Sequence, residues 1–312
     1  MNDRRFRISV PATSANLGPG FDTIGVALDR RIIADVEVAP GGDDVRFEFV
    51  QTPYAPTHEG LRNEIARGIT RVLGRNIPPL YVRVENHVPL GKGLGGSAAG
   101  AVLGVAIGAE LAPRRPDEGT LTQFITEIEG HPDNGIPAFL GGVVIAAQNR
   151  DRPPSYIRFE PPRGLYATVV VPDFDMPTAQ ARAVLPTSYS RRDTVYNIQH
   201  AALLGAALGT GRFDLLRSAM QDRIHQPYRA SFVPGLQEMI ALELPGLFGV
   251  ALSGAGPSVI AFVDRLEHPV GGAMQEIFRA HRIESVALSL QIANSGVVVT
   301  DVPAAQRAFG ES

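Results

Sequence analysis

Short apolar segments are spread along the whole chain, and their spacing predicts a series of β-strands. The clearest is Val-Arg-Phe-Glu-Phe-Val at 45–50, where apolar and polar residues alternate strictly. A first strand at 7–10 ends at Pro11, and residues 24–38 hold one or two strands. Further strands are predicted at 80–84, 139–146, 166–171, 247–252, 259–262, 285–290 and 297–302.

Other segments place apolar residues every three or four positions, which predicts helices. Within 63–73 the side chains of Ile65, Ile69 and Val72 share one helix face. Helices are likewise predicted at 98–109, 120–129, 193–208 and 273–281, with another beginning at 177–182.

Length and composition allow two domains. The chain has 312 residues, 44% of them hydrophobic, which is enough for one large or two medium cores. Composition breaks at 149–154 and again at 161–164, where proline and charged residues gather. We therefore expect one domain at 1–155 and a second at 156–312.

Charge and cysteine content exclude several classes of function. A net charge of −3 implies no polyanionic partner such as nucleic acid. The absence of cysteine excludes disulfides, thiolate metal sites and cysteine nucleophiles. The N-terminal residues are charged, and the longest apolar run, 98–109, is too short and too rich in glycine to span a bilayer. We expect a cytoplasmic protein with no membrane partner.

A glycine-rich stretch lies between the predicted strand at 80–84 and the predicted helix at 98–109. Such a turn exposes backbone N–H groups beside the positive end of a helix dipole, which makes an anion site, most often for phosphate. Ser97 at the helix start could cap the helix or bind a metal held by phosphate. Lys92 is the chain's only lysine, and its ammonium suits a phosphate unless its place on the turn is coincidence.

Three phosphate-loop patterns can be compared with this stretch. A Walker A loop fails, because it needs lysine where Ser97 stands. A dinucleotide fingerprint fails, because no second strand with an acidic end follows. The third pattern, Pro-x-Gly-x-Gly-Leu-Gly-Ser-Ser-Ala, belongs to the GHMP small-molecule kinases, and the stretch resembles it except at Gly96. The resemblance implies that ATP is bound by Pro89, Gly91, Lys92, Gly93, Leu94, Gly95, Gly96, Ser97 and Ala98.

Five other polar segments carry candidate chemistry. By residue type alone each has an ordinary explanation as a turn, a helix end, a surface arginine or a hairpin. Glu129, at a helix end near the phosphate loop, would suit Mg²⁺, with Glu127 as its rival. Arg182 follows Thr178 by one helical turn and could bind a carboxylate with both ends of its guanidinium. The segments are 11–22, 129–134, 178–182, 222–229 and 253–258.

Together with the phosphate loop, these segments resemble the homoserine kinases of the GHMP superfamily, in the family's order. The resemblance implies an α+β fold of two domains, the first like domain 2 of ribosomal protein S5 and the second ferredoxin-like, with the site between them. It implies an ATP-dependent kinase that uses Mg²⁺ and converts L-homoserine to O-phospho-L-homoserine, a step toward threonine. A homodimer is a family-level expectation.

The resemblance also implies residue roles. Arg182 and Arg229 would hold the substrate carboxylate, and Ser97 and Glu129 would hold Mg²⁺. The ammonium and hydroxyl of the substrate would be held by Asn16, Asp22, Asp133 and Asn134, and His131 would also bind substrate. The catalytic residues would be Asp133, Asn134 and Thr178. The residues near ATP would include Asn63, Gly254 and Gly256. Asn63 could equally be a helix N-cap. Two alternatives stay open: another GHMP kinase, such as one acting on mevalonate, and a non-catalytic nucleotide-binding homologue.

Overall fold

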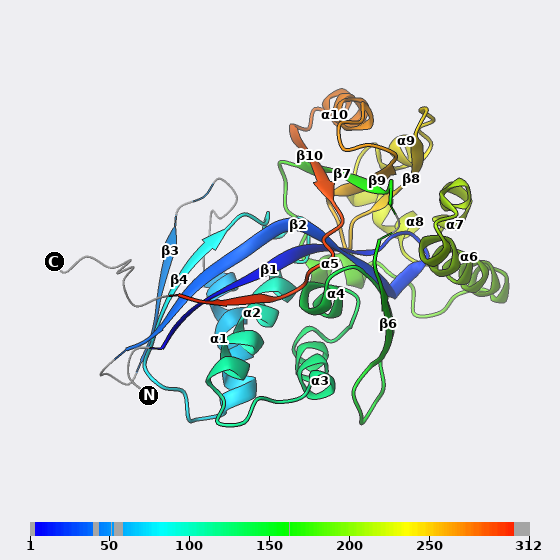
Figure 1. The fold of residues 1–312 in the computed structure, drawn as a ribbon. Coiled ribbons are helices and arrows are strands. Elements are labelled where there is room, and N and C mark those ends of the chain that lie inside the picture. The colour runs from blue at the N-terminus through cyan, green and yellow to red at the C-terminus, as the bar shows by residue number, and fades with distance from the viewer. Residues whose placement is uncertain (1–3, 40–43, 51, 53–58, 162, 303–312) are drawn as a thin grey trace.

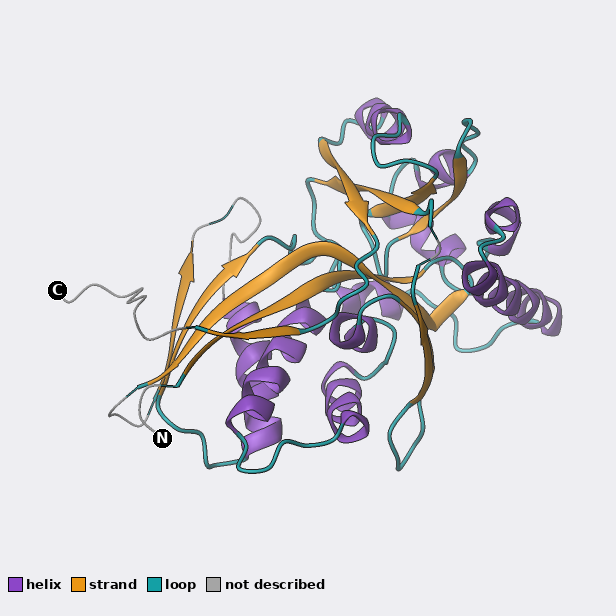
Figure 2. Ribbon diagram, viewed as in Figure 1, coloured by secondary structure: helices purple, strands orange, loops and turns teal. Residues whose placement is uncertain are grey.

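The computed structural model describes residues 4–39, 44–50, 52, 59–161 and 163–302. Two β-sheets lie side by side, and helices cover them (Figures 1 and 2). Within the described residues, every helix is too short or too polar to cross a membrane.

The larger sheet has seven strands, built around a long hairpin of two antiparallel strands. The central order is β11-β1-β2-β4-β3, and β2 also pairs with β5, which pairs with β6. All pairs are antiparallel except β3 with β4. The strands are β1 (Arg5–Asn16), β2 (Gly20–Val38), β3 (Val45–Val50), β4 (Leu80–Asn86), β5 (Val143–Ala147), β6 (Ser155–Phe159) and β11 (Val298–Asp301).

Helices α1, α2 and α3 lie together on one side of this sheet (Figure 1). A Cβ on Gly68 of α1 would lie 2.4 Å from the carbonyl oxygen of Ala101, and one on Gly104 of α2 would lie 2.0 Å from that of Ile65. Glycine is required at both positions, because α1 and α2 touch through their backbones there. The helices are α1 (Glu59–Leu73), α2 (Gly96–Leu111), α3 (Glu118–Glu129) and the short α4 (Gly135–Leu140).

The smaller sheet has four antiparallel strands in the order β10-β7-β9-β8. Numbered along the chain this is 4-1-3-2, the order of a ferredoxin-like unit, as predicted. Its strands are β7 (Tyr166–Pro172), β8 (Leu247–Leu252), β9 (Val259–Val263) and β10 (Ser285–Gln291). The helices are α5 (Thr178–Ala183), α6 (Arg191–Thr210), α7 (Leu216–Ala219), α8 (Gln226–Arg229), α9 (Leu236–Ile240) and α10 (Val270–Ala280), with 3₁₀ turns at Phe213–Leu215 and Ala230–Phe232.

One hydrophobic cluster runs from the larger sheet into the smaller one, and a second lies beneath α9 and α10. The chain also crosses between the sheets twice. Strand β6 begins where we expected the second domain, yet both β6 and β11 pair within the larger sheet. The division at 1–155 and 156–312 stays a prediction.

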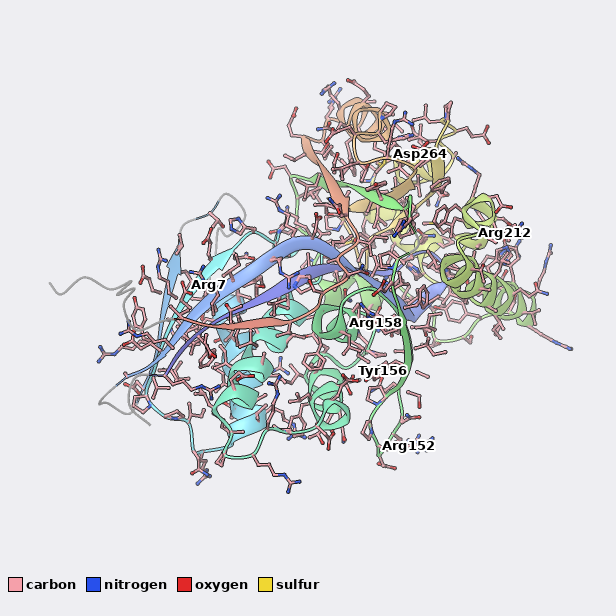
Figure 3. The ribbon with its side chains drawn as sticks, in the orientation of Figure 1. Arg7, Arg152, Tyr156, Arg158, Arg212 and Asp264 are labelled. Atoms are coloured by element: carbon pink, nitrogen blue, oxygen red, sulfur yellow. The ribbon has the colours of Figure 1, made fainter. Side chains whose placement is uncertain are left out.

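Besides the pairing of β5 with β2, side-chain contacts attach the β5–β6 hairpin to its neighbours. Figure 3 shows Arg158, Tyr156 and Arg152 following one another along it. The hydroxyl of Tyr156 donates to Glu118 at the start of α3 (2.5 Å), and Nη2 of Arg158 donates to the carbonyl of Asn294 (2.6 Å). These contacts join the hairpin to the helices below it and to the chain that leads into β11.

Two sequence expectations about secondary structure were wrong. The first strand does not end at Pro11: β1 continues through a bulge between Pro11 and Ala12 to Asn16, so much of the expected loop at 11–22 is strand. Residues 139 and 140 end helix α4 instead of opening a strand. Their apolar run fitted either element, because short apolar runs do not separate a buried strand from a helix turn.

Candidate active site

A cavity of about 310 Å³ collects residues from both halves of the chain. Its lining comes from the first strands, the glycine loop, helices α1 and α8, the end of α3 and the segment after it, the α5 region and the β8–β9 turn. The lining residues are Asn16, Asp22, Arg67, Gly91, Gly93, Gly95, Gly96, Ser97, Ala98, Ile128, Glu129, His131, Asp133, Asn134, Met176, Arg182, Arg229, Gly254, Ala255 and Gly256.

The glycine loop is held in its shape by close contacts that only glycine permits. Gly95 is the N-cap of α2 with φ 66°, and a Cβ there would lie 1.9 Å from Oγ1 of Thr13. A Cβ on Gly93 (φ 80°) would lie 2.3 Å from the carbonyl oxygen of Ser253. No side chain caps α2 at Gly95, and the residues of its first turn, Gly96, Ser97 and Ala98, line the cavity, so the N–H groups of that turn are available to an anion there.

The loop is also tied to the β8–β9 turn. The hydroxyl of Ser253 donates to the carbonyl of Gly93 (2.7 Å), and the amide of Ser258 donates to the carbonyl of Lys92 (3.2 Å). Gly254 and Gly256 therefore lie at the cavity beside the glycine loop, and their place near ATP stays a prediction.

The ammonium of Lys92 is bound by protein groups. It donates to the carbonyl of Phe174 (2.9 Å) and pairs with the carboxylate of Asp175 (2.8 Å) in the segment before α5. Among the described residues, Lys92, Pro89 and Leu94 are not part of the cavity lining. Leu94 is buried, and its carbonyl accepts the amide of Thr13.

Ser97 and Glu129 meet at the cavity. The Ser97 hydroxyl donates to Oε1 of Glu129 at 3.2 Å. Burial raises the pKa of Glu129 to about 7, against the opposing charge of His131. A partly buried carboxylate beside a hydroxyl is an all-oxygen donor set of the kind Mg²⁺ takes together with phosphate oxygens.

The rival carboxylate, Glu127, has other partners. It pairs with Arg71 at 2.5 Å, and Gln123 donates to it at 2.9 Å. The Arg71 hydrogen bond holds the pKa of Glu127 below its usual value. Glu127 lines a second hollow instead, so the contacts favour Glu129 as the metal ligand.

Two carboxylates and one imidazole lie close together at the cavity. Nδ1 of His131 lies 2.5 Å from Oδ1 of Asp133, and atoms of Asp22, His131 and Asp133 fall within 4.8 Å of one another. Burial lowers the pKa of His131, but the hydrogen bond and charge of Asp133 outweigh it and the net shift is upward. The cluster is thus suited to a cation or to a hydroxyl proton.

Asn16 and Asn134 hold the backbone near this cluster. Oδ1 of Asn16 accepts the amide of Asp22 (3.0 Å), and its Nδ2 donates to the carbonyl of Gly254 (2.8 Å). Oδ1 of Asn134 accepts the Thr13 hydroxyl at 2.8 Å. Both asparagines line the cavity, and both also fix neighbouring segments.

The two predicted arginines both line the cavity, but they differ in burial and in the groups that they contact. Arg182 makes a two-pronged ion pair with Asp22, at 2.8 and 3.0 Å, across 160 positions of sequence. Arg229 is 1% exposed and donates to the carbonyls of Ala181 (3.0 Å) and Gly254 (3.3 Å). Burial, and then the charge of Arg182, lower the pKa of Arg229 to about 10.

Two predicted site residues remain, Asn63 and Thr178. Asn63 lines the second hollow, of about 900 Å³, which shares Arg67 and Ile128 with the first. Thr178 begins α5, and its side chain lies outside the described part of the structure. Three lining residues, Arg67, Ile128 and Met176, were not predicted, because each belongs to a segment with an ordinary helix or loop pattern. A fourth, Ala255, lies in the predicted 253–258 segment but was not itself named as a site residue.

Comparison with known proteins gives the family. The GHMP kinases N terminal domain matches residues 62–142, and the GHMP kinases C terminal domain matches residues 204–273. A homoserine kinase of Solibacter usitatus is 41% identical over 95% of this chain and 97% of its own length. The chain belongs to the homoserine kinase family. A homoserine kinase of Deinococcus radiodurans is 46% identical over 84% of this chain and 85% of its own length.

Solved structures agree with the homoserine kinase fold. The structure of homoserine kinase from Cytophaga hutchinsonii superposes with a TM-score of 0.83 at 28% identity, covering 95% of this chain and 98% of that one. A mevalonate kinase superposes with a TM-score of 0.64 at 12% identity, which shows the shared fold alone. The predicted two-domain α+β GHMP fold is confirmed.

Proposed function

We propose that this protein transfers the γ-phosphoryl group of ATP to the side-chain hydroxyl of L-homoserine. The observation that carries the proposal is that one cavity holds both a glycine-built helix N-terminus and the guanidinium groups of Arg182 and Arg229. The first suits the phosphates of a nucleotide, and the second suits the carboxylate of an amino acid. Membership of the homoserine kinase family agrees with this pairing.

On the nucleotide side, the backbone of the glycine loop and the first turn of α2 would bind the phosphates. The base would extend into the second hollow, which Asn63 lines and which Arg67 joins to the cavity. Ser97 and Glu129 would hold Mg²⁺, which offsets the phosphate charge when it is bound.

On the acceptor side, the Arg182–Asp22 ion pair has the same charges as a zwitterionic amino acid. We infer that homoserine would separate this pair, its carboxylate taking Arg182 and its ammonium taking Asp22. Arg229 would supply a second guanidinium to the carboxylate. Mevalonate has a carboxylate but no ammonium, so it would leave Asp22 without a partner cation, which is costly in a partly buried site.

In the reaction, the acceptor hydroxyl oxygen forms a bond to the γ-phosphorus while the bond between that phosphorus and the β,γ-bridging oxygen breaks. ADP leaves with the electron pair of that bond. Asp133, paired with His131, would take the hydroxyl proton. Positioning supplies most of the rate, because a loose phosphoryl-transfer transition state needs little deprotonation beforehand.

The test is ADP release by the purified protein with Mg·ATP and L-homoserine, with mevalonate and L-serine as control acceptors. We expect turnover that strongly favours homoserine and a phosphate ester in the product by ³¹P NMR. Turnover with mevalonate instead would assign another GHMP activity. ATP binding without turnover of any acceptor would indicate a non-catalytic homologue. Oligomeric state, for which we propose a homodimer, is read from light scattering of the same sample.

A further inference from the structure

His225 is fully buried, and our account of the reaction gives it no role. It stands just before the short helix α8, four residues before Arg229. Its ring lies between the turn that follows β1 and the guanidinium of Arg229.

The contacts of the ring fix its tautomer. Nε2 lies 2.7 Å from the carbonyl oxygen of Gly18, which can only accept, so Nε2 carries the proton. Nδ1 lies 3.2 Å from Nη1 of Arg229, which can only donate, so Nδ1 is the acceptor. A protonated ring would place an N–H against the guanidinium, so this geometry requires neutral histidine.

Groups around the ring agree with a neutral state. Burial lowers the pKa of His225, the charge of Arg229 lowers it further, and the carboxylates of Asp222 and Asp22 oppose both. Oδ2 of Asp222 lies 3.6 Å from Nε2, but it already accepts the backbone amides of His225 (3.0 Å) and Gln226 (2.6 Å). Asp222 thus sets the backbone that carries the ring.

The ring also supports the acceptor site through an aromatic contact. It stacks on Phe21 at 5.3 Å between ring centroids. The guanidinium carbons of Arg182 and Arg229 lie 5.6 and 5.4 Å from the centre of the same Phe21 ring. Both carboxylate-binding side chains therefore lie near Phe21, which His225 supports from behind by stacking, and Arg229 also contacts His225 itself.

We propose that His225 is a positioning residue for the acceptor: anchored on Gly18 through Nε2–H, it presents Nδ1 to Arg229 and orients that guanidinium toward the substrate carboxylate. The proposal rests on the proposed function, in which Arg229 binds homoserine. It adds a residue that acts through Arg229 and does not line the described cavity.

Two substitutions separate the two ring nitrogens. Asparagine places an acceptor oxygen where Nδ1 stands, so His225→Asn keeps the hydrogen bond to Arg229. Glutamine places an N–H donor where Nε2 stands, so His225→Gln keeps the anchor to Gly18 and loses the acceptor. We expect KM for homoserine to rise about 10-fold in His225→Gln and to stay within about 3-fold of the native value in His225→Asn. KM for ATP and kcat should change little in both variants.

Equal homoserine KM values in the two variants, or a rise in KM for ATP as large as that for homoserine, would overturn the proposal and leave only a packing role. A second measurement needs no stable variant: ¹⁵N NMR of the native protein at about pH 7 should show a neutral Nε2–H ring for His225. An Nδ1–H ring or an imidazolium overturns the proposal. If the native protein itself does not use homoserine, the proposed function is wrong, and this inference is wrong with it.

Discussion

In the proposed function, the nucleotide side and the acceptor side of the cavity would recognise negative charge in different ways. The glycine loop does so with backbone groups, and its shape depends on Gly93 and Gly95 making contacts too close for any Cβ. The acceptor side does so with Arg182 and Arg229, whose charges are partly or fully buried. Even the one lysine of the loop is bound elsewhere, to Phe174 and Asp175.

The difference determines which substitutions each side tolerates. A backbone site fails when a side chain pushes the loop out of shape, whatever its charge. A guanidinium site fails when charge is removed, even if shape is kept. The two sides should therefore separate in kinetics: loop variants should lose ATP binding, and arginine variants should lose homoserine binding.

The largest effect is expected for Gly95→Ala. The new Cβ would strain a left-handed backbone and also collide with Thr13, shifting the first turn of α2. We expect kcat/KM for ATP to fall at least about 10²-fold, since a shift of about 1 Å at the reacting groups can cost that much. The matched control is Gly164→Ala, which has the same left-handed strain (φ 83°) with nothing within 4 Å of the new Cβ.

Gly164→Ala should lose about 1 kcal/mol of stability and keep its activity. Thermal unfolding followed by circular dichroism gives the stability, and the coupled ADP assay gives the activity. If both variants lost activity equally, strain alone would explain the effect, and the close contact with Thr13 would not matter.

Next in size is Arg182→Met, which keeps the length of the side chain and removes its charge. We expect KM for homoserine to rise about 30-fold, because a hydrogen bond to a charged group typically contributes about 2 kcal/mol to binding. KM for ATP should stay nearly unchanged. Arg212→Met is the control, because Arg212 forms a similar two-pronged ion pair with Asp214 on the exposed surface. A rise in KM for ATP as large as that for homoserine would contradict the assignment of the two substrates to separate sides of the cavity.

A smaller effect is expected for Glu129→Gln, measured as the Mg²⁺ concentration that gives half-maximal activity. Loss of a carboxylate beside Ser97 should raise that concentration at least about 10-fold, the effect usual for removing even an outer partner of a metal site. Glu127→Gln should leave the Mg²⁺ requirement unchanged, since Glu127 pairs with Arg71. The reverse result would assign the metal to Glu127.

The nucleotide side was the more predictable of the two from sequence. Its strand, glycines and helix are consecutive, so a local pattern is enough to predict an anion site at Gly91–Gly96 and a helix after it. The acceptor side unites Asp22 with Arg182, 160 positions away, and only the resemblance to a family brought them together before the fold was known. Local sequence patterns also predicted the wrong secondary structure at two places. The apolar residues at 139 and 140 fit a strand as well as a helix, and they end helix α4. At Pro11 a bulge lets strand β1 continue where the pattern predicted its end.

Contacts of single side chains were the least predictable. Arg67 was not predicted, because it lies on the polar face of an ordinary helix. His225 lies in the predicted 222–229 segment, but its contact with Arg229 was not predicted. Lys92 was predicted to bind phosphate from its position within the loop, and that role stays a prediction. The partners of its ammonium depend on how the 173–175 segment packs against the loop, which no local pattern contains.

The smallest effect is expected for Lys92→Met, which tests whether the nucleotide side uses any side-chain cation. The Lys92–Asp175 pair has one well-exposed partner, and such pairs contribute about 0.2–1 kcal/mol. If Lys92 only links the loop to the segment before α5, its removal should raise KM for ATP less than about 5-fold. Asp175→Asn should have a similar effect, and the double variant should be no worse than either, because both remove one contact. If Lys92 instead leaves Asp175 to bind phosphate, Lys92→Met should raise KM for ATP more than about 10-fold, and Asp175→Asn should not. In that case the contrast between a backbone site and a side-chain site would hold only for the protein without ATP.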